Sequence, residues 1–156
     1  MKVFDKITNL LIKNNVEFEH YKHDFIHKST EAALIRGNDI KNTAKAIVMK
    51  YYEEGQKKYV QFVLQGDKKI NTKRLKKLGF KKLGLASPEE VLKVTGCAIG
   101  SVPPFGNLFE LQVIVDVHLK QNEYIYFSAG THYDSIKIKF KDYEKVVKPK
   151  IMDATS

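Results

Sequence analysis

The strand-forming patterns of this chain fall into two groups that do not alternate regularly with helices. Residues 46–49 and 59–64 are strand-like and flank Glu53-Glu54-Gly55-Gln56, a turn sequence that predicts a hairpin. Further strands are predicted at residues 16–21, 111–117, 123–127 and 135–140. Because the strand–helix–strand alternation of doubly wound folds is absent, we expect an α+β fold with one mixed, curled β-sheet flanked by helices.

Helical patterns occupy the N-terminus and the interval between the two strand groups. Apolar residues at helical spacing predict a helix from Phe4 to Asn14. Ser87-Pro88-Glu89-Glu90 combines the serine and glutamate of a capping box with proline at the first helical position, so a helix begins there and ends at Gly96. Shorter helices are predicted at residues 29–37, 71–78 and 142–147.

The length of 156 residues suits one domain, which we expect to occupy residues 1–148, with a tail or linker at 149–156. No apolar stretch approaches the roughly 18–20 residues of a membrane span, and the N-terminus lacks a secretion signal. A single cysteine, Cys97, excludes an internal disulfide, and its small neighbours favour a buried packing role over a nucleophilic one. A soluble cytoplasmic protein without a membrane partner is therefore expected.

Net charge is the first indication of a partner. The chain has 27 basic and 18 acidic residues, a formal charge of +9 that favours a polyanion such as nucleic acid. Only Arg36 and Arg74 are arginine, the usual residue for bidentate recognition of phosphate or guanine. A lysine-rich coding bias would produce the same composition, so the charge alone identifies no partner.

The segment from Gly100 to Gly106 is the most unusual in the chain. Its two glycines and two prolines, Pro103 and Pro104, predict an irregular loop that presents backbone groups rather than side chains. Such a loop is either a rigid connection or a preorganised set of donors and acceptors around a small ligand.

A second candidate loop, residues 128–134, follows a predicted strand. Gly130 permits a close approach to the backbone, and His132 is a hydrogen-bond donor or proton carrier near neutral pH. A solvated loop histidine is the simpler alternative. Ser128, His132 and Asp134 lie too close together in the sequence to form a catalytic triad, which is usually assembled from separated segments.

Other site chemistries find little support. No Cys-x-x-Cys is present, so neither a metal nor a cofactor is expected. The histidines are His20, His23, His27, His118 and His132. Gly66-Asp67-Lys68-Lys69 lacks the paired glycines of a phosphate-binding P-loop. Lys45 has unusually small neighbours at the start of an apolar strand, although most lysines in such a chain are simply solvated.

Five segments together resemble the YbaK/ProX family of aminoacyl-tRNA deacylases, which is related to the editing domain inserted in bacterial prolyl-tRNA synthetases. The resemblance covers about residues 3–148, with the segments in the order and spacing of the family. They are Ala44–Lys50 around Lys45, Leu64–Asn71, Leu85–Cys97, the Gly100–Gly106 loop with the family's Gly-x-x-x-Pro pattern at Gly100 and Pro104, and Ser128-Ala129-Gly130.

The resemblance implies a barrel-like sheet and an enzyme that hydrolyses the ester between a wrong amino acid and the 3′-terminal adenosine of a tRNA. It implies that Lys45 clamps the ribose or phosphate end and that Gly100 and His132 act at the reacting ester. The implied substrate-binding residues are Ser101, Pro103, Pro104, Phe105, Ser128 and Gly130. No side chain stands out as a general base, and the 2′-hydroxyl of the tRNA is the family's proposed aid to water attack.

Substrate identity stays open at this point, because Ser101-Val102-Pro103 and residues 131–134 depart from common family patterns. Alanine or cysteine on proline tRNA are the first candidates, and another small amino acid or another tRNA is the alternative. The chain is either free-standing or part of, or associated with, a larger synthetase. A non-catalytic module that binds a tRNA acceptor end or a nucleotide is the main competing function, and a protein-interaction domain is the third.

Overall fold

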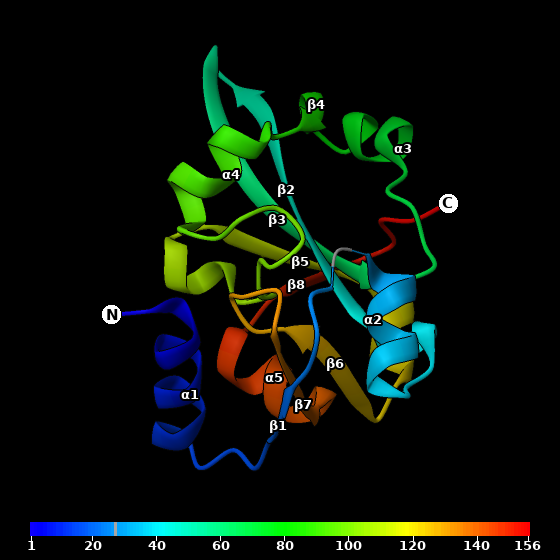
Figure 1. The fold of residues 1–156 in the computed structure, drawn as a ribbon. Coiled ribbons are helices and arrows are strands. Elements are labelled where there is room, and N and C mark those ends of the chain that lie inside the picture. Colours follow the sequence, from blue (N-terminus) through cyan, green and yellow to red (C-terminus); the bar gives the residue numbers. More distant parts are fainter. Residues whose placement is uncertain (27) are drawn as a thin grey trace.

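The predicted hairpin forms the long arm of the larger of two sheets (Figure 1). The computed structural model describes residues 1–26 and 28–156, so His27 lies outside the described residues. Strands β2 (Ala44–Glu53) and β3 (Gln56–Gln65) pair antiparallel along their whole length. Their two-residue turn has positive φ at both Glu54 (51°) and Gly55 (78°), as a type I′ turn requires.

The larger sheet is mixed, as predicted. Its strand order is β4-β2-β3-β5-β8, with β4 (Lys81–Leu85) antiparallel to β2. On the other side, β5 (Gln112–Asp116) runs parallel to β3, and β8 (Lys150–Met152) runs parallel to β5. The sequence patterns did not predict β4 or β8.

A second, fully antiparallel sheet has the order β1-β7-β6. Its strands are β1 (Glu19–Lys22), β6 (Tyr124–Ser128) and β7 (Asp134–Lys139). The expectation of one curled, barrel-like sheet is therefore wrong. Closure into a barrel needs continuous ladders around the sheet. In the described residues, the only β-bridge that joins the two sheets is the one between Thr43 and Tyr126.

The helices cover the sheets and close three apolar clusters. In the described residues they are α1 (Val3–Lys13), α2 (Ser29–Arg36), α3 (Thr72–Lys77), α4 (Pro88–Thr95) and α5 (Phe140–Val147), with short 3₁₀ turns η1 (Ile40–Asn42), η2 (Gly106–Phe109) and η3 (Val117–Gln121). Helices α1 and α5 pack on the largest cluster, which includes Ile7, Phe127 and Tyr143. None of the described helices combines the length and apolar character needed to cross a bilayer.

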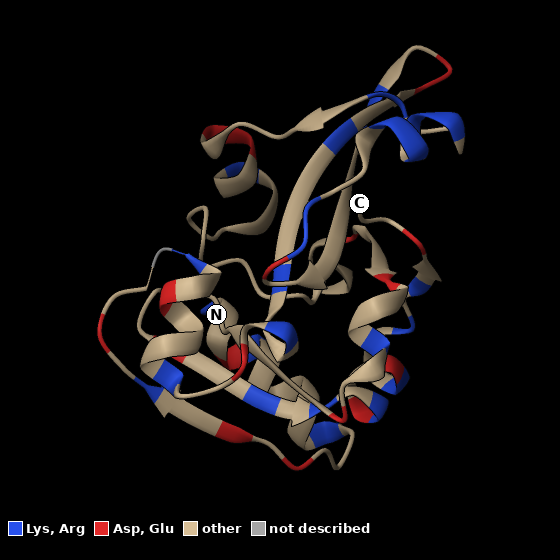
Figure 2. Cartoon of the chain, turned by 90° about the vertical axis from the view of Figure 1, so that its right-hand side faces the viewer, with Lys and Arg blue, Asp and Glu red and all other residues tan. Residues whose placement is uncertain are grey.

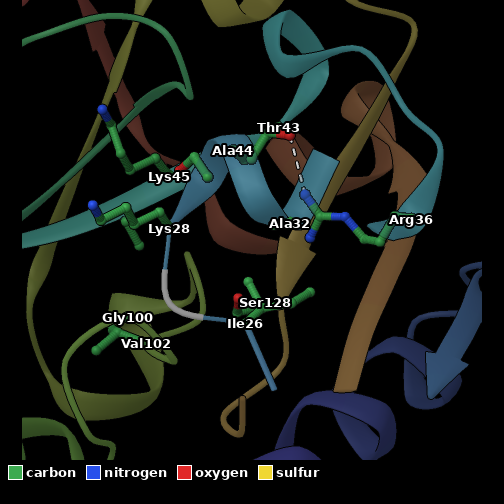
Figure 3. A pocket seen from close by; sticks show the side chains of 12 residues that line it. Ile26, Lys28, Ala32, Arg36, Thr43, Ala44, Lys45, Gly100, Val102 and Ser128 are labelled. Atoms are coloured by element: carbon green, nitrogen blue, oxygen red, sulfur yellow. Dashed lines mark hydrogen bonds between the residues drawn. The ribbon is translucent and has the colours of Figure 1, made fainter. Parts of the chain in front are cut away.

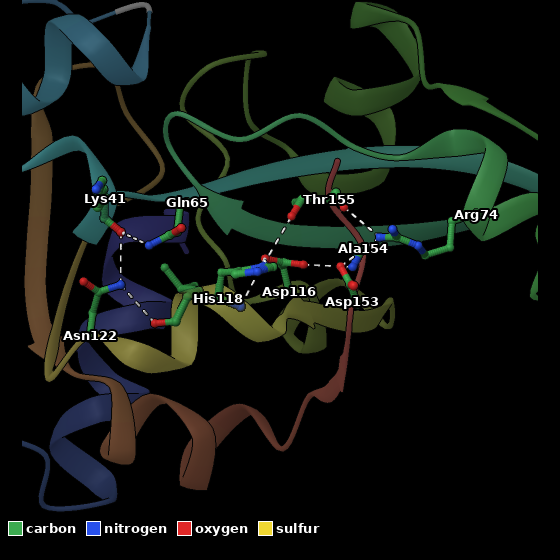
Figure 4. A network of polar contacts seen from close by, with 10 residues as sticks. Lys41, Gln65, Arg74, Asp116, His118, Asn122, Asp153, Ala154 and Thr155 are labelled. Atoms are coloured by element: carbon green, nitrogen blue, oxygen red, sulfur yellow. Dashed lines mark hydrogen bonds and ion pairs between the residues drawn. The ribbon is translucent and has the colours of Figure 1, made fainter.

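Residues 149–156 are not the tail or linker that the sequence predicted. They contribute β8, and Ala154 and Thr155 are almost fully buried. Buried Asp116 accepts a hydrogen bond from the Ala154 N–H (2.8 Å), and the Arg74 guanidinium donates to the Thr155 carbonyl (2.7 Å) (Figure 4). The short, proline-preceded strand is formed by these tertiary contacts, which local sequence does not reveal.

The capping box of α4 is present as predicted. Ser87 Oγ accepts from the Glu90 N–H (3.1 Å), and Glu90 Oε1 accepts from the Ser87 N–H (3.0 Å). Replacing Ser87 with alanine is expected to lower the free energy of unfolding by about 1 kcal/mol, because one helical N–H loses its acceptor. Urea denaturation checks this value, with exposed Ser156→Ala as the control. An unchanged denaturation midpoint in Ser87→Ala would contradict the role of the cap.

Candidate active site

A small cavity lies where the start of β2 meets α2, the end of β6 and the loop after α4 (Figure 3). Its volume is about 90 Å³. The described residues that line it are Ile26, Lys28, Ser29, Ala32, Arg36, Thr43, Ala44, Lys45, Ala46, Gly100, Val102 and Ser128. Three residues singled out in the sequence, Lys45, Gly100 and Ser128, therefore reach one cavity from three separate segments.

A second cavity of about 250 Å³ adjoins the first and is mostly apolar. It shares Lys45, Ala46, Gly100 and Val102 with the smaller cavity, so these residues stand between the two spaces. The remaining residues that line it are Ile47, Val48, Leu85, Ala86, Val91 and Ile99. A ligand with two parts can therefore occupy both cavities, with its junction beside Lys45 and Gly100.

Lys45 is held in place by the turn that follows β3. Its Nζ donates to the carbonyl oxygens of Gly66 (3.2 Å) and Lys68 (2.7 Å). Gly66 leaves room for η1 and α2, because a Cβ there would lie 2.9 Å from Ile40 Cγ1 and 3.0 Å from Ser29 Cβ. Burial lowers the pKa of Lys45 below its usual value, and the charge of Asp67 opposes this effect. Two of the three ammonium donors are thus used for positioning, which leaves one for a ligand.

Arg36 faces the same cavity from the side opposite Lys45 and Lys28 (Figure 3). Its guanidinium donates to Thr43 Oγ1 (3.0 Å), Ser135 Oγ (3.1 Å) and Asn38 Oδ1 (3.0 Å). Within the described part of the chain it pairs with no carboxylate. Burial lowers its pKa to about 10, so it remains protonated at neutral pH.

No sequence motif marked Arg36 as functional. The available indication was its rarity, because the chain has only two arginines among 27 basic residues. Both make several directed hydrogen bonds, as Arg74 does with Asp153 (2.8 Å) and the Thr155 carbonyl (2.7 Å). The planar, multiply donating guanidinium is suited to such sites in a way that lysine is not.

The Gly100–Gly106 loop divides into a cavity-facing part and a core-facing part. Gly100 has φ of 88° at the third position of the turn from Ala98 to Ser101, and it lines both cavities with Val102. Among residues 1–26 and 28–156, the N–H groups of Gly100 and Val102 have no hydrogen-bond acceptor. This leaves two neighbouring backbone donors for a ligand.

The rest of that loop faces the core. The carbonyl of Pro103 accepts from buried Gln61 Nε2 (2.9 Å), and that of Pro104 accepts from the Tyr143 hydroxyl (2.6 Å). Phe105 is fully buried, and Ser101 Oγ donates to the Ala98 carbonyl (2.7 Å). The structure therefore does not place these predicted substrate-binding residues on the cavity wall. Their contacts hold the Gly100–Val102 segment in position.

The second predicted loop also contributes less to the wall than expected. Gly130 donates its N–H to the Ser101 carbonyl (3.0 Å), and a Cβ there would lie 3.0 Å from Val3 Cγ1. The absence of a side chain at Gly130 thus allows the start of α1 to pack closely against this loop. His132 stacks on Phe25 (4.3 Å between ring centroids), and its Nδ1 donates to the Ile26 carbonyl (2.8 Å). His132 therefore positions Ile26, which lines the cavity.

The geometry agrees with the sequence in disfavouring two catalytic roles, a Ser128–His132–Asp134 triad and a nucleophilic Cys97. Asp134 accepts from His20 Nε2 (2.7 Å) and from the Thr131 hydroxyl (2.7 Å), a different partner set from that of a Ser128–His132–Asp134 triad. Cys97 is buried, and burial raises the pKa of its thiol, which disfavours a thiolate.

One group of described residues has ligand atoms close enough to share a metal ion. Asp116, His118 and Asp153 place these atoms within 4.8 Å of one another (Figure 4). Both carboxylate oxygens of Asp116 already accept hydrogen bonds, from the Ala154 N–H and from His118 Nδ1 (both 2.8 Å). None of the three residues lines the cavity, so the group is accounted for as a clamp on the C-terminal segment.

Comparison with known proteins identifies the family. The family model of the aminoacyl-tRNA editing domain matches residues 23–146. The chain belongs to this editing-domain family. The resemblance found in the sequence is therefore confirmed, and with it the expectation of an aminoacyl-tRNA editing domain.

Three relatives of this editing domain are informative. The multifunctional Ser/Thr-tRNA deacylase ProXp-y of Escherichia coli is 29% identical over 150 residues, which are 95% of this chain and 90% of that protein. A proline–tRNA ligase of Trichlorobacter lovleyi is 33% identical over 87 residues, 55% of this chain and 15% of the ligase. A solved structure of a proposed trans-editing enzyme for prolyl-tRNA synthetase has the same fold, with a TM-score of 0.82 at 21% identity over 100% of this chain and 98% of that one.

Proposed function

We propose that this editing domain hydrolyses the ester of a tRNA mischarged with a small amino acid, with preference for serine and threonine. The observation that carries the proposal is the convergence of Lys45, Gly100 and Arg36 on one small cavity. The name of the E. coli relative, a Ser/Thr-tRNA deacylase, supports the same choice of amino acids.

The cavity limits the size of the amino acid. Its volume of about 90 Å³ is below the roughly 150 Å³ of an apolar cavity that binds benzene, so aromatic side chains are excluded. Thr43 Oγ1 accepts from both Arg36 and Asn38 Nδ2 (3.0 Å each), which leaves its own proton to donate. A hydroxyl oxygen on the substrate is the acceptor that we assign to this proton and to the Arg36 guanidinium.

The ester would lie between the two cavities. In our assignment the Lys45 ammonium fixes the ribose or phosphate of the terminal nucleotide, and the larger apolar cavity takes its base. The N–H groups of Gly100 and Val102 donate to the oxyanion that forms when water adds to the ester carbonyl. Collapse of that intermediate releases the amino acid and returns a hydroxyl to the terminal ribose.

Proton transfer from the attacking water is assigned to the substrate. Among the described residues that line the cavity, none is a carboxylate or a histidine. The ribose hydroxyl next to the ester is therefore the group that we propose relays the proton. An aminoacyl ester is already activated, so positioning and oxyanion stabilisation supply the main acceleration.

Proline tRNA is the tRNA that we propose, as two of the relatives carry prolyl-tRNA synthetase in their names. Alanine and cysteine, the first candidates from sequence, are small enough for the cavity but lack an oxygen acceptor. They are expected to be hydrolysed more slowly than serine or threonine.

The test is deacylation of proline tRNA charged with radiolabelled serine, threonine, alanine, cysteine or proline. We expect hydrolysis of the serine and threonine esters at least 10-fold faster than that of the proline ester. No hydrolysis above the uncatalysed rate for any charged tRNA would overturn the proposal. Salt-dependent binding of tRNA without turnover would instead favour the non-catalytic acceptor-end module.

A further inference from the structure

Most of the net positive charge of this chain comes from one short segment. Residues 67–82, here called the basic segment, hold eight of the 27 basic residues and one of the 18 acidic residues. Their net charge of +7 leaves only +2 for the other 140 residues of the +9 chain. A uniform lysine enrichment from coding bias would spread the charge, so this concentration needs a local explanation.

The basic segment is held rigidly against the fold. It comprises the turn after β3, the helix α3 and the first residues of β4. Leu75 is fully buried in the cluster beneath α3, and Asn71 Oδ1 caps the helix by accepting from the Arg74 N–H (3.0 Å). The exposed lysines of α3, which are Lys73, Lys76 and Lys77, therefore project from a fixed backbone as one array.

The lysines of this array are not neutralised by the protein. Within the described part of the chain, no ion pair involves Lys68, Lys69, Lys73, Lys76, Lys77, Lys81 or Lys82. Arg74 differs, since it is bound to Asp153 and the Thr155 carbonyl. Seven uncompensated lysines in 16 residues repel one another and weaken folding, which indicates that they serve a polyanionic partner.

The basic segment begins at the edge of the active-site cavity. The Lys68 carbonyl accepts one of the hydrogen bonds that hold the Lys45 ammonium (2.7 Å). Figure 2 shows basic residues continuing from this turn onto α3, which lies toward the turn of the β2–β3 hairpin, since β4 begins opposite Tyr52. A nucleic acid whose end enters the cavity therefore has the basic segment next to it.

We propose that the basic segment is the docking surface for the phosphate backbone of the double-stranded stem adjoining the 3′ end of the substrate tRNA. This inference rests on the proposed function and adds a separate binding surface to it. Lysine suits the task, because a point charge on a flexible stem contacts phosphates of any base sequence. Specificity then comes from the cavity, and affinity from the segment.

The test compares two triple variants on two substrates. Lys73, Lys76 and Lys77 of α3 are replaced by glutamine, and three exposed lysines elsewhere, Lys13, Lys139 and Lys141, are replaced in the control. The substrates are full-length seryl-tRNA and a serylated CCA fragment that has no duplex. Because the fragment cannot reach the basic segment, it reports on the cavity alone.

For the α3 triple variant we expect kcat/KM on full-length tRNA to fall at least 10-fold, with less than a twofold change on the fragment. The slope of log kcat/KM against log salt concentration should become shallower by about 2–3, roughly one per lost phosphate contact. The control triple should stay within twofold of the wild type on both substrates. Equal losses on tRNA and fragment, or equal losses in the two triples, would overturn the proposal.

Binding of uncharged tRNA separates this inference from the proposed function. If the wild type hydrolyses neither substrate, the proposed function fails, and fluorescence anisotropy with labelled tRNA still tests the docking surface. Weaker tRNA binding by the α3 triple variant, with unchanged binding by the control triple variant, supports the docking surface. If the α3 triple variant binds tRNA like the wild type but no longer binds vesicles containing phosphatidylserine, the basic segment is a membrane-binding surface. That result would overturn the proposal.

Discussion

Replacing Lys45 with methionine is expected to lower kcat/KM for hydrolysis of seryl-tRNA by about 10²–10³-fold, the size of effect seen when one preorganised donor at a reacting centre is removed. Methionine keeps most of the apolar stem but removes the ammonium of a residue that lines both cavities. Deacylation assays on the charged-tRNA panel measure the loss. The carbonyls of Gly66 and Lys68 fix the position of this ammonium.

The matched control for this substitution is Lys41→Met, on an exposed lysine four residues earlier. It removes the same charge from the same region and should leave kcat/KM within about twofold. Thermal unfolding of Lys45→Met shows whether the loss of two hydrogen bonds has weakened the fold. A variant that is folded and as active as Lys41→Met would contradict the assignment of Lys45 to the substrate.

Local patterns were sufficient to predict the hairpin and the capped helix. The β2–β3 hairpin follows from two apolar runs and a turn whose glycine accepts positive φ. Helix α4 follows from Ser87 and Glu90, which satisfy each other's backbone donors within four residues. In both cases the residues that decide the structure are neighbours in the sequence.

The arrangement of the strands into two sheets was beyond such patterns. Strand β5 pairs with β3 across an interval that includes α3, β4 and α4, and β8 pairs with β5 across an interval that includes β6, β7 and α5. Ile136 and Ile138 alternate with lysines, a pattern that indicates one buried face of β7, and both isoleucines are buried. The pattern carried no information on which strands β7 would pair with.

The candidate site was predicted unevenly for a related reason. Sequence identified the unusual loop from Gly100 to Gly106, but its direction is set by distant groups. Gln61 and Tyr143 take the carbonyls of Pro103 and Pro104, and so turn Gly100 and Val102 toward the cavity. Arg36 was missed because its role depends on Thr43 and Ser135, which only the folded chain brings to it.

Replacing Arg36 with methionine is expected to reduce the preference for serine over alanine by about 10–100-fold. A hydrogen bond to a charged group contributes about 1.5–3 kcal/mol, and each 1.4 kcal/mol is a factor of ten in rate. The measured quantity is the ratio of kcat/KM for seryl-tRNA to that for alanyl-tRNA. A partial loss of folded enzyme lowers both values equally, so the ratio reports on the cavity even if this half-buried arginine also stabilises the fold.

Thr43→Val is the graded counterpart of that variant, since it removes a neutral hydroxyl from the same cluster with little change in shape. Its ratio should fall less, by about 2–10-fold, in keeping with roughly 0.5–1.5 kcal/mol for a neutral hydrogen bond. If Arg36 reads the substrate hydroxyl, the ratios decline in the order wild type, Thr43→Val, Arg36→Met. An Arg36→Met enzyme with the wild-type ratio would restrict Arg36 to holding Thr43 and Ser135. Any preference for serine over alanine would then come from another group on the cavity wall, such as Thr43 Oγ1.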